Sequence, residues 1–175
     1  MAKFKTLPDL LYHVSANYSD QKSINELQNS VWVNHSTSEI VSTIHALAAG
    51  FSKMGLKKGE TVGLYAPSTS TWVMIDMAIL IAGGITVPIF SNISHSGLEY
   101  IIEDANLKFI FVEGEESLKE IHSLVHRFEK IILHSASHNE ENACQFDEVL
   151  NIGKEAVSKE PAVISQLMGQ VYEND

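Results

Sequence analysis

The sequence is poor in the residues from which disulfide-bonded and nucleic-acid-binding proteins are built. Cys144 is the single cysteine among 175 residues, so no disulfide forms within the chain, which fits a reducing cytoplasm. Twelve basic and 22 acidic residues give a formal net charge of -10, without any local cluster of Lys and Arg. Because this charge has the wrong sign for a phosphate backbone, we expect no nucleic-acid partner.

Long hydrophobic runs are also missing. The longest, Trp72 to Ile81, contains Asp76 and is shorter than the ~20 residues that a membrane span requires. Near the N-terminus, Pro8, Asp9 and His13 interrupt the apolar core that a secretory signal would keep. We therefore expect no transmembrane segment and a cytoplasmic location, while the 45% apolar content excludes a disordered chain.

Glycine-rich phosphate-binding motifs are absent. Gly50, Gly55, Gly59 and Gly63 are too widely spaced for a dinucleotide fingerprint, and no glycine-rich run precedes Lys and Ser or Thr. We interpret these four glycines as helix ends and turns. A serine nucleophile in a GxSxG elbow is absent too.

Four isolated residues are the remaining candidates for chemistry. His122 and His126 stand one helical turn apart and could share a metal, but a third ligand is not evident, so a solvated helix face is favoured. Cys144 lies in a polar stretch without an activating partner. Asp76 is either a buried acid or, as we favour, a hydrogen-bonded or partly exposed carboxylate. We assign no catalytic, cofactor-binding or metal-binding residue.

What the chain does contain is a strand, helix and strand between Lys57 and Phe90. Thr61 to Tyr65 is a short strand that ends at Pro67, Trp72 to Ala82 is an apolar helix, and Ile85 to Pro88 is a second strand. Such crossovers in one sheet are nearly always right-handed and join parallel strands. This unit predicts an α/β fold.

The same alternation extends along the chain. The pattern predicts helices over 7–18, 36–54, 98–105, 115–127, 146–152 and 161–171, strands over 108–112 and 130–133, a β-hairpin of 23–27 with 31–34, and a surface excursion over 134–145. We expect a mostly parallel sheet flanked by helices. Residues 1–36 would form a helix and the small N-terminal hairpin, 37–133 the α/β core, and 134–175 a loop and terminal helices.

Six fragments in a fixed order connect the chain to a known family. They are Trp32, TSEI (37–40), LAAGFSKMGLKKGETVGLYAPS (47–68), Trp72, AILIAGGITVPIF (78–90) and LEYIIEDANLKFIFV (98–112). In this order they resemble the N-terminal region of AMP-forming acyl-CoA synthetases, in the adenylate-forming superfamily. The N-terminal helix, the segment after Leu133 and the final LMGQVYEND most resemble the long-chain fatty acid branch. Ser68 departs from the family, which usually has Asn there.

The resemblance implies a single incomplete domain, the N-terminal subdomain of the adenylate-forming fold. It also implies that the full-length enzyme activates a fatty acid with ATP and Mg²⁺ to an acyl-adenylate, which CoA then attacks. The family's phosphate loop, rich in Ser, Thr and Gly with a lysine, would be expected just beyond Asp175. No catalytic residue of the family maps onto this sequence.

Three hypotheses follow. The first is a fragment of a long-chain fatty acid CoA ligase that is inactive alone and self-associates through uncovered apolar surface and strand edges. In full length it would bind fatty acid, ATP and CoA and could contact a membrane surface peripherally. The second is a free-standing, non-catalytic α/β binding or oligomerisation module derived from the same family. The third, a receiver-type or flavodoxin-like domain, is disfavoured because no acidic pair ends a strand.

Overall fold

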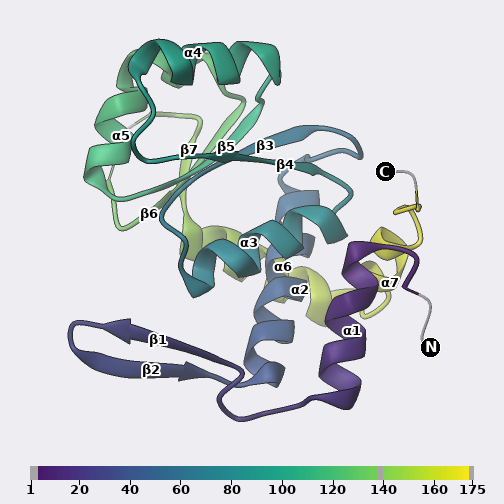
Figure 1. Ribbon diagram of the computed structural model, residues 1–175. Coiled ribbons are helices and arrows are strands. Elements are labelled where there is room, and N and C mark those ends of the chain that lie inside the picture. Colours follow the sequence, from purple (N-terminus) through teal and green to yellow (C-terminus); the bar gives the residue numbers. More distant parts are fainter. Residues whose placement is uncertain (1–3, 138–139, 174–175) are drawn as a thin grey trace.

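The computed structural model describes residues 4–137 and 140–173, which fold into a parallel sheet between two helical layers and a separate hairpin (Figure 1). The helices are α1 (Leu7–Asn17), α2 (Thr37–Lys53), α3 (Ser70–Ile81), α4 (His95–Asp104), α5 (Glu115–Ile121), α6 (Phe146–Lys159) and α7 (Val163–Met168), with a 3-10 segment η1 (His122–Arg127). The strands are β1 (Ile24–Gln28), β2 (Val31–His35), β3 (Thr61–Tyr65), β4 (Ile85–Ile89), β5 (Phe109–Glu113), β6 (Lys130–His134) and β7 (Ala143–Gln145).

The main sheet has the order β4-β3-β5-β6-β7 in the part of the chain that the structure describes, and every neighbouring pair is parallel. The predicted α/β class is therefore confirmed, as is the strand, helix and strand unit between Lys57 and Phe90. The strand order is the one that flavodoxin-like folds use, so the topology agrees with that hypothesis although its site residues are missing.

Both faces of the central strands β3, β5 and β6 are buried, because helices cover each face of the sheet (Figure 1). Val62, Leu64, Phe109 and Phe111 belong to the core shared with α2, α3 and α6. The alternate strand positions, among them Ile110 and Val112, pack with α4 and α5 in a second core. Since side chains alternate between faces, the near-continuous apolar runs of β3 and β5 are what a doubly covered strand needs.

The long helix α2 begins at a capping box formed by Ser36 and Glu39. Ser36 Oγ accepts a hydrogen bond from the Glu39 backbone N–H at 3.2 Å, and Glu39 Oε2 accepts one from the Ser36 backbone N–H at 2.8 Å. These bonds satisfy two of the amides that a helix start leaves without partners. The capping box therefore defines the N-terminal end of α2, which follows β2 directly.

Two glycines bring α2 and α6 into backbone contact. A Cβ atom at Gly153 would lie 1.7 Å from the Ala46 carbonyl oxygen, and one at Gly50 would lie 2.4 Å from that of Val149. The interpretation of Gly50 as a helix end is therefore wrong, because it lies inside α2 at a helix crossing. Gly63 likewise lies inside β3, whereas Gly55 and Gly59 have φ of 101° and 78° and do form turns.

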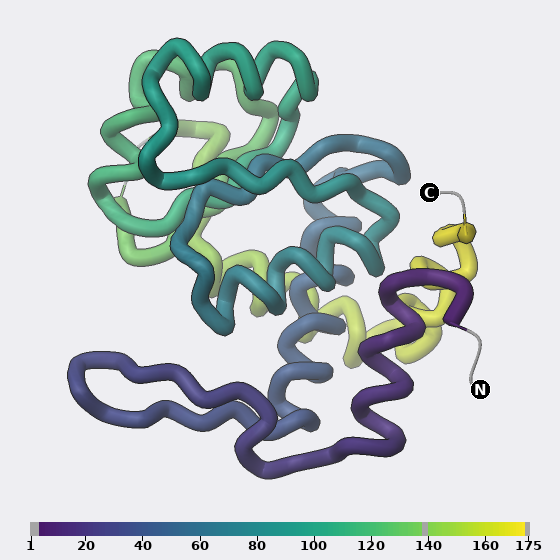
Figure 2. The backbone as a smooth tube through the Cα atoms, in the orientation of Figure 1, coloured from purple at the N-terminus to yellow at the C-terminus, as the bar shows by residue number. Residues whose placement is uncertain are grey.

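The predicted hairpin is confirmed as the two-stranded antiparallel pair β1–β2. Its turn residues Asn29 and Ser30 have φ of 50° and 64°, the left-handed values that a two-residue type I′ turn requires. The hairpin extends away from the body of the fold, beside the N-terminal end of α2 (Figure 2).

Three predictions between 115 and 159 need correction. The helix expected over 115–127 is α-helical only to Ile121 and continues as η1. The surface excursion over 134–145 contains the strand β7, with His138 and Asn139 outside the described residues. Finally, α6 is twice as long as the expected 146–152, because Gly153 permits close packing on α2 and does not end the helix.

Candidate functional site

The topology places the carboxyl edge of the sheet, where the carboxyl ends of its parallel strands lie, in the position where α/β proteins bind ligands. From β3 the chain crosses to β4 on one side, and from β4 it crosses back to β5 on the other side of β3. The winding therefore reverses between β3 and β5. Ligands of such sheets bind outside the carboxyl ends of the strands at this reversal.

Two short segments border this place. Pro67 ends β3, and Thr69 caps α3 by accepting the Trp72 backbone N–H at 3.2 Å. Opposite them, Gly114 follows β5 with φ of 86° and faces open space. Both segments are shaped by backbone conformation.

The charges at this carboxyl edge are unsuitable for phosphate groups. The segments that leave the strand ends, 66–69, 90–94, 113–116 and 134–137, contain no Lys or Arg but include Glu113, Glu115 and Glu116. Phosphate binding needs cationic or N–H donors aimed at the anion. The described residues of these segments therefore supply no cationic side chain to an anion such as a phosphate or a carboxylate.

Lysines gather at the opposite, amino edge of the sheet. Lys57, Lys58, Lys108 and Lys130 lie just before or at the start of a strand. Lys108 Nζ is 3.0 Å from Glu60 Oε1 and 3.2 Å from Glu129 Oε1, and hydrogen bonding to Glu60 raises the pKa of Lys108. These ion pairs hold β5 and β6 to the start of β3.

One titratable pair lies at the carboxyl edge itself. Glu113 and His134 are register partners at the ends of β5 and β6, with His134 Nδ1 3.3 Å from Glu113 Oε1. The imidazole stacks on Phe111 and meets Phe146 edge-on, at ring centroid distances of 6.2 and 5.1 Å. This arrangement packs the histidine ring against the apolar core that α6 covers.

A Ser, His and Glu cluster, which the sequence reasoning missed, joins the hairpin to α3. Ser70 Oγ donates to Glu26 Oε2 at 2.7 Å and lies 3.5 Å from His35 Nε2. The bond from Ser70 holds the pKa of Glu26 below its usual range. In a hydrolytic triad the carboxylate binds the histidine, whereas here it binds the serine. The cluster therefore anchors the hairpin and does not activate a nucleophile.

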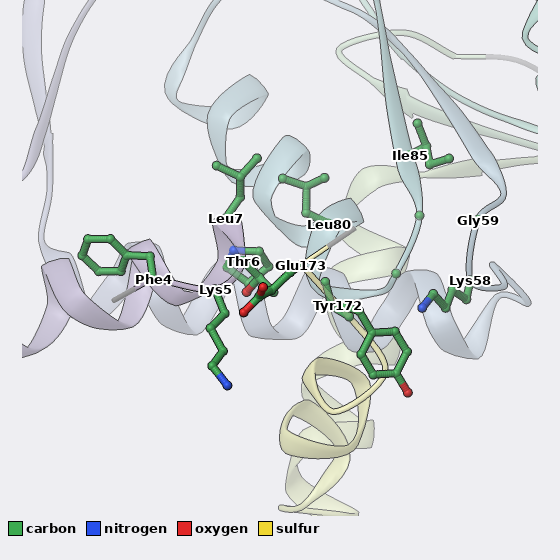
Figure 3. A pocket seen from close by; sticks show the side chains of 14 residues that line it. Phe4, Lys5, Thr6, Leu7, Lys58, Gly59, Leu80, Ile85, Tyr172 and Glu173 are labelled. Atoms are coloured by element: carbon green, nitrogen blue, oxygen red, sulfur yellow. The ribbon is translucent and has the colours of Figure 1, made fainter. Parts of the chain in front are cut away.

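A cavity of about 490 Å³ lies at the amino edge, between the start of α1, the turns before β3 and β4, and residues 171–173 (Figure 3). Its wall is mainly apolar, with Phe4, Leu7 and Ile85 among the lining side chains. Lys58 is engaged there, since Nζ donates to the Gln170 carbonyl at 2.7 Å and lies 4.0 Å from the Tyr172 ring centroid. This cavity lies at the amino ends of the strands, whereas α/β folds bind their ligands at the carboxyl ends.

The four residues considered from sequence do not come together. His122 and His126 are exposed on η1, where three residues complete a turn, so their side chains do not align as on an α-helix. Among residues 4–137 and 140–173 no group of three His, Cys, Asp or Glu side chains could hold a metal ion. Burial raises the pKa of the half-buried Cys144 thiol on β7 to about 11, and Asp76 is partly exposed, as favoured. Within these described ranges, no helix is long and apolar enough to cross a membrane.

Comparisons with known proteins agree with this doubly wound α/β architecture. A family model described as AMP-binding enzyme matches residues 13–166. The long-chain-fatty-acid–CoA ligase ACSBG2 of Mus musculus is 24% identical over 116 residues, which cover 66% of this chain and 17% of that enzyme. The long-chain-fatty-acid–CoA ligase FadD15 of Mycobacterium tuberculosis is 28% identical over 89 residues, or 51% of this chain and 15% of that enzyme.

Solved structures give the same answer for the fold. The anthranilate CoA ligase AuaEII, in complex with anthranoyl-AMP, matches with a TM-score of 0.68 at 20% identity over 83% of this chain and 28% of that one. Acetoacetyl-CoA synthetase from Streptomyces lividans matches with a TM-score of 0.73 at 11% identity, over 83% and 25% of the two chains.

The fold is thus a doubly wound α/β fold that these solved structures share. The chain belongs to the family of AMP-binding enzymes. It spans less than a fifth of the length of the two long-chain ligases described above.

Proposed function

We propose that this chain is the N-terminal, scaffold-forming part of a long-chain fatty acid CoA ligase, and that its 175 residues are one incomplete domain. The observation that carries the proposal is the family match over residues 13–166 together with long-chain ligases as relatives. The short share of each relative that the chain covers supports the view that most of the enzyme lies elsewhere.

The complete enzyme would act in two steps. A fatty acid carboxylate oxygen attacks the α-phosphorus of ATP, with Mg²⁺ present, and the bond to pyrophosphate breaks, which leaves an acyl-adenylate. The CoA thiolate then attacks the acyl carbon, and AMP leaves with the electron pair of the broken carbon–oxygen bond. Both steps need cationic donors at the phosphates, because negative charge builds there.

We assign no step to residues of this chain. The acidic strand ends that carry Glu113, Glu115 and Glu116 support this view, since they would repel a triphosphate. The contribution of the chain would be the rigid sheet, on which the rest of the enzyme places its phosphate and acyl sites. A cytoplasmic location and contact with a membrane surface stay predictions.

The test is ATP–pyrophosphate exchange driven by palmitate, because exchange reports the adenylation step alone. It would be measured on the 175-residue chain and on the longer polypeptide that the same reading frame encodes, each with and without palmitate. We expect palmitate-dependent exchange from the longer polypeptide and none from the chain. A longer polypeptide that binds ATP but shows no exchange with any fatty acid would refute the proposal.

The alternative is a non-catalytic α/β binding module that keeps the family fold. The same lack of Lys and Arg at the carboxyl edge favours it, since a module has no need of phosphate donors there. The reading frame discriminates between the two. Continuation into a loop rich in Ser, Thr and Gly with a lysine supports the ligase, and a stop codon directly after Asp175 supports the module.

A further inference from the structure

The cavity at the amino edge of the sheet presents apolar side chains to water. Leu7 of α1, Ile85 of β4 and Tyr172 line it, and they are 64%, 50% and 63% exposed. Leu80 of α3 belongs to the same wall (Figure 3). The cavity volume of about 490 Å³ falls within the ~300–1,000 Å³ that small-molecule sites in proteins occupy. The cavity therefore has the size and the lining of a site for an apolar ligand.

Two glycine turns keep one side of the cavity free of side chains. Gly59 and Gly83 both line it, with φ of 78° and 82°, values that glycine adopts without strain. The Gly59 N–H donates to the Gly83 carbonyl oxygen at 2.8 Å, so the two turns are fixed to each other. A Cβ atom at Gly59 would meet nothing within 4 Å. The space is thus held open by backbone, as in a preformed ligand site.

Positive charge borders this apolar wall. Figure 3 shows Lys5 on one side of the cavity and Lys58 on the other, while Glu173 is the single acid in the lining that the structure describes. The Lys5 ammonium forms no hydrogen bond or ion pair within residues 4–137 and 140–173. Its charged neighbour Asp9 accepts the backbone N–H groups of Lys5 and Thr6, each at 2.9 Å, and so is held at the start of α1. On a chain with a net charge of -10, this lining is a local excess of positive charge.

We propose that the cavity binds a fatty acid at a non-catalytic site, with the carboxylate against Lys5 and the hydrocarbon chain along Leu7, Ile85 and Tyr172. A hydrocarbon chain with one negative end complements an apolar wall that cations border. The segments at the carboxyl edge offer no Lys or Arg to such an anion. The inference goes beyond the proposed function, because the cavity lies at the opposite strand ends from the ligand position of α/β folds.

Other occupants fit this lining less well. A neutral apolar molecule would leave the Lys5 ammonium without a partner, and a cationic amphiphile would be repelled by both lysines. An anionic lipid bilayer would be repelled by the net charge of -10. A single fatty acid has the required apolar length and the required sign of charge.

Nuclear magnetic resonance of the isotope-labelled chain locates the site. Dodecanoate is titrated at monomeric concentrations, and we expect the amide signals of Leu7, Gly59 and Gly83 to shift while that of Gly114 at the carboxyl edge does not. From octanoate through decanoate to dodecanoate, affinity should rise roughly fourfold for each methylene group that the cavity covers. Dodecanol and dodecylamine should bind about fivefold more weakly or worse. Shifts confined to the carboxyl edge, or an alcohol that binds as tightly as the acid, would overturn the inference.

Charge variants test the role of Lys5. Lys5→Met removes the charge and should weaken dodecanoate binding about fivefold, whereas Glu173→Gln removes the opposing acid and should strengthen it. Lys119→Met is the matched control, because this exposed lysine is on α5, far from both chain termini (Figure 1), and should change neither. Equal affinity of the Lys5→Met and Lys119→Met chains would contradict the placement of the carboxylate.

A second set of variants tests the apolar wall. Leu7→Gln combined with Ile85→Gln should lower the affinity roughly tenfold, and because both side chains are exposed the fold is retained. Leu10→Gln is the control, since Leu10 is also on α1 and 43% exposed but is outside the lining. Binding of the chain to phosphatidylglycerol vesicles with no response to monomeric dodecanoate would identify a membrane surface as the occupant and overturn the inference. The titration contains no ATP, so it is independent of the exchange assay. Exchange by the longer polypeptide without fatty acid binding at this cavity refutes the inference alone, and binding without exchange refutes the proposed function alone.

Discussion

Replacing Gly153 by Ala should destabilise the fold, although alanine is the better helix former. Gly153 lies within α6 where it crosses α2, and an added Cβ would be 1.7 Å from the Ala46 carbonyl oxygen and 2.9 Å from the Gly50 backbone nitrogen. These obstacles are backbone atoms, which cannot rotate away as a side chain can. The two helices must therefore move apart.

The size of the effect follows from these distances. Restoring a carbon-to-oxygen contact of ~3.3 Å requires a local shift of about 1.6 Å. Overpacking of this kind costs about 1–3 kcal/mol, and the gain in helix propensity returns only about 1 kcal/mol. The difference is about 0–2 kcal/mol. Because the Val149 side chain and the first core lie under this crossing, we expect a net loss in its upper half, about 1–2 kcal/mol, or about 2–8 °C in Tm.

Urea unfolding followed by far-UV circular dichroism measures the loss. Gly97→Ala is the matched control, because Gly97 is also inside a helix but its Cβ would meet Ile93 Cγ1 at 3.0 Å, a side-chain atom that can yield. Gly50→Ala, with a Val149 carbonyl at 2.4 Å, should lie between the two. A Gly153→Ala chain as stable as the Gly97→Ala chain would refute the close crossing of α2 and α6.

Three further predictions concern the hairpin anchor and two titratable groups. Ser70→Ala should cost about 1 kcal/mol through the lost bond to Glu26 and should speed amide exchange in the hairpin, whereas the exposed Ser68→Ala should do neither. Burial lowers the pKa of His45, so the unfolded state binds more protons at this residue than the folded state does. The stability that depends on a neutral His45 is therefore complete above the unfolded pKa of about 6.5 and is lost on acidification. His45→Gln should therefore reduce the fall in urea midpoint between about pH 7.5 and 5.5, and an unchanged pH profile would contradict this assignment. With a pKa of about 11, Cys144 should react slowly with a disulfide reagent in the folded chain and rapidly in urea; equal rates would contradict its burial.

The elements with strong apolar periodicity could be predicted from sequence. The helix at 36–54, the unit from Lys57 to Phe90 and the hairpin agree with the structure within a few residues. In each of these, local signals agree with the tertiary arrangement: a capping box, a proline at a strand end, or a turn that needs positive φ. The AMP-binding family also followed from the order of such fragments.

The features that could not be predicted from the sequence depend on contacts between residues that are far apart along the chain. β7 is only Ala143–Gln145, without a β-branched residue, and becomes a strand because β6 offers it a parallel edge. Gly50 and Gly153 look like helix breakers until α2 and α6 are seen in contact. Ser70 and Glu26, which are 44 residues apart, meet only after the hairpin docks on α3.

The position of the candidate site could not be predicted from the sequence. The absence of a glycine-rich loop and of clustered cations is visible in the sequence, and the structure adds where it matters, at the strand ends between β3 and β5. The position of the four lysines at the amino edge could not be read from spacing alone. It required the parallel order of the strands.

Palmitate-dependent ATP–pyrophosphate exchange, measured side by side on this chain and on the longer polypeptide of the same reading frame, tests the scaffold assignment most directly. The account predicts exchange in the longer polypeptide alone, because the strand ends of this chain carry Glu113, Glu115 and Glu116 and no cation. Exchange by the 175-residue chain itself would contradict it, since adenylation would then have to be carried out by the residues described above.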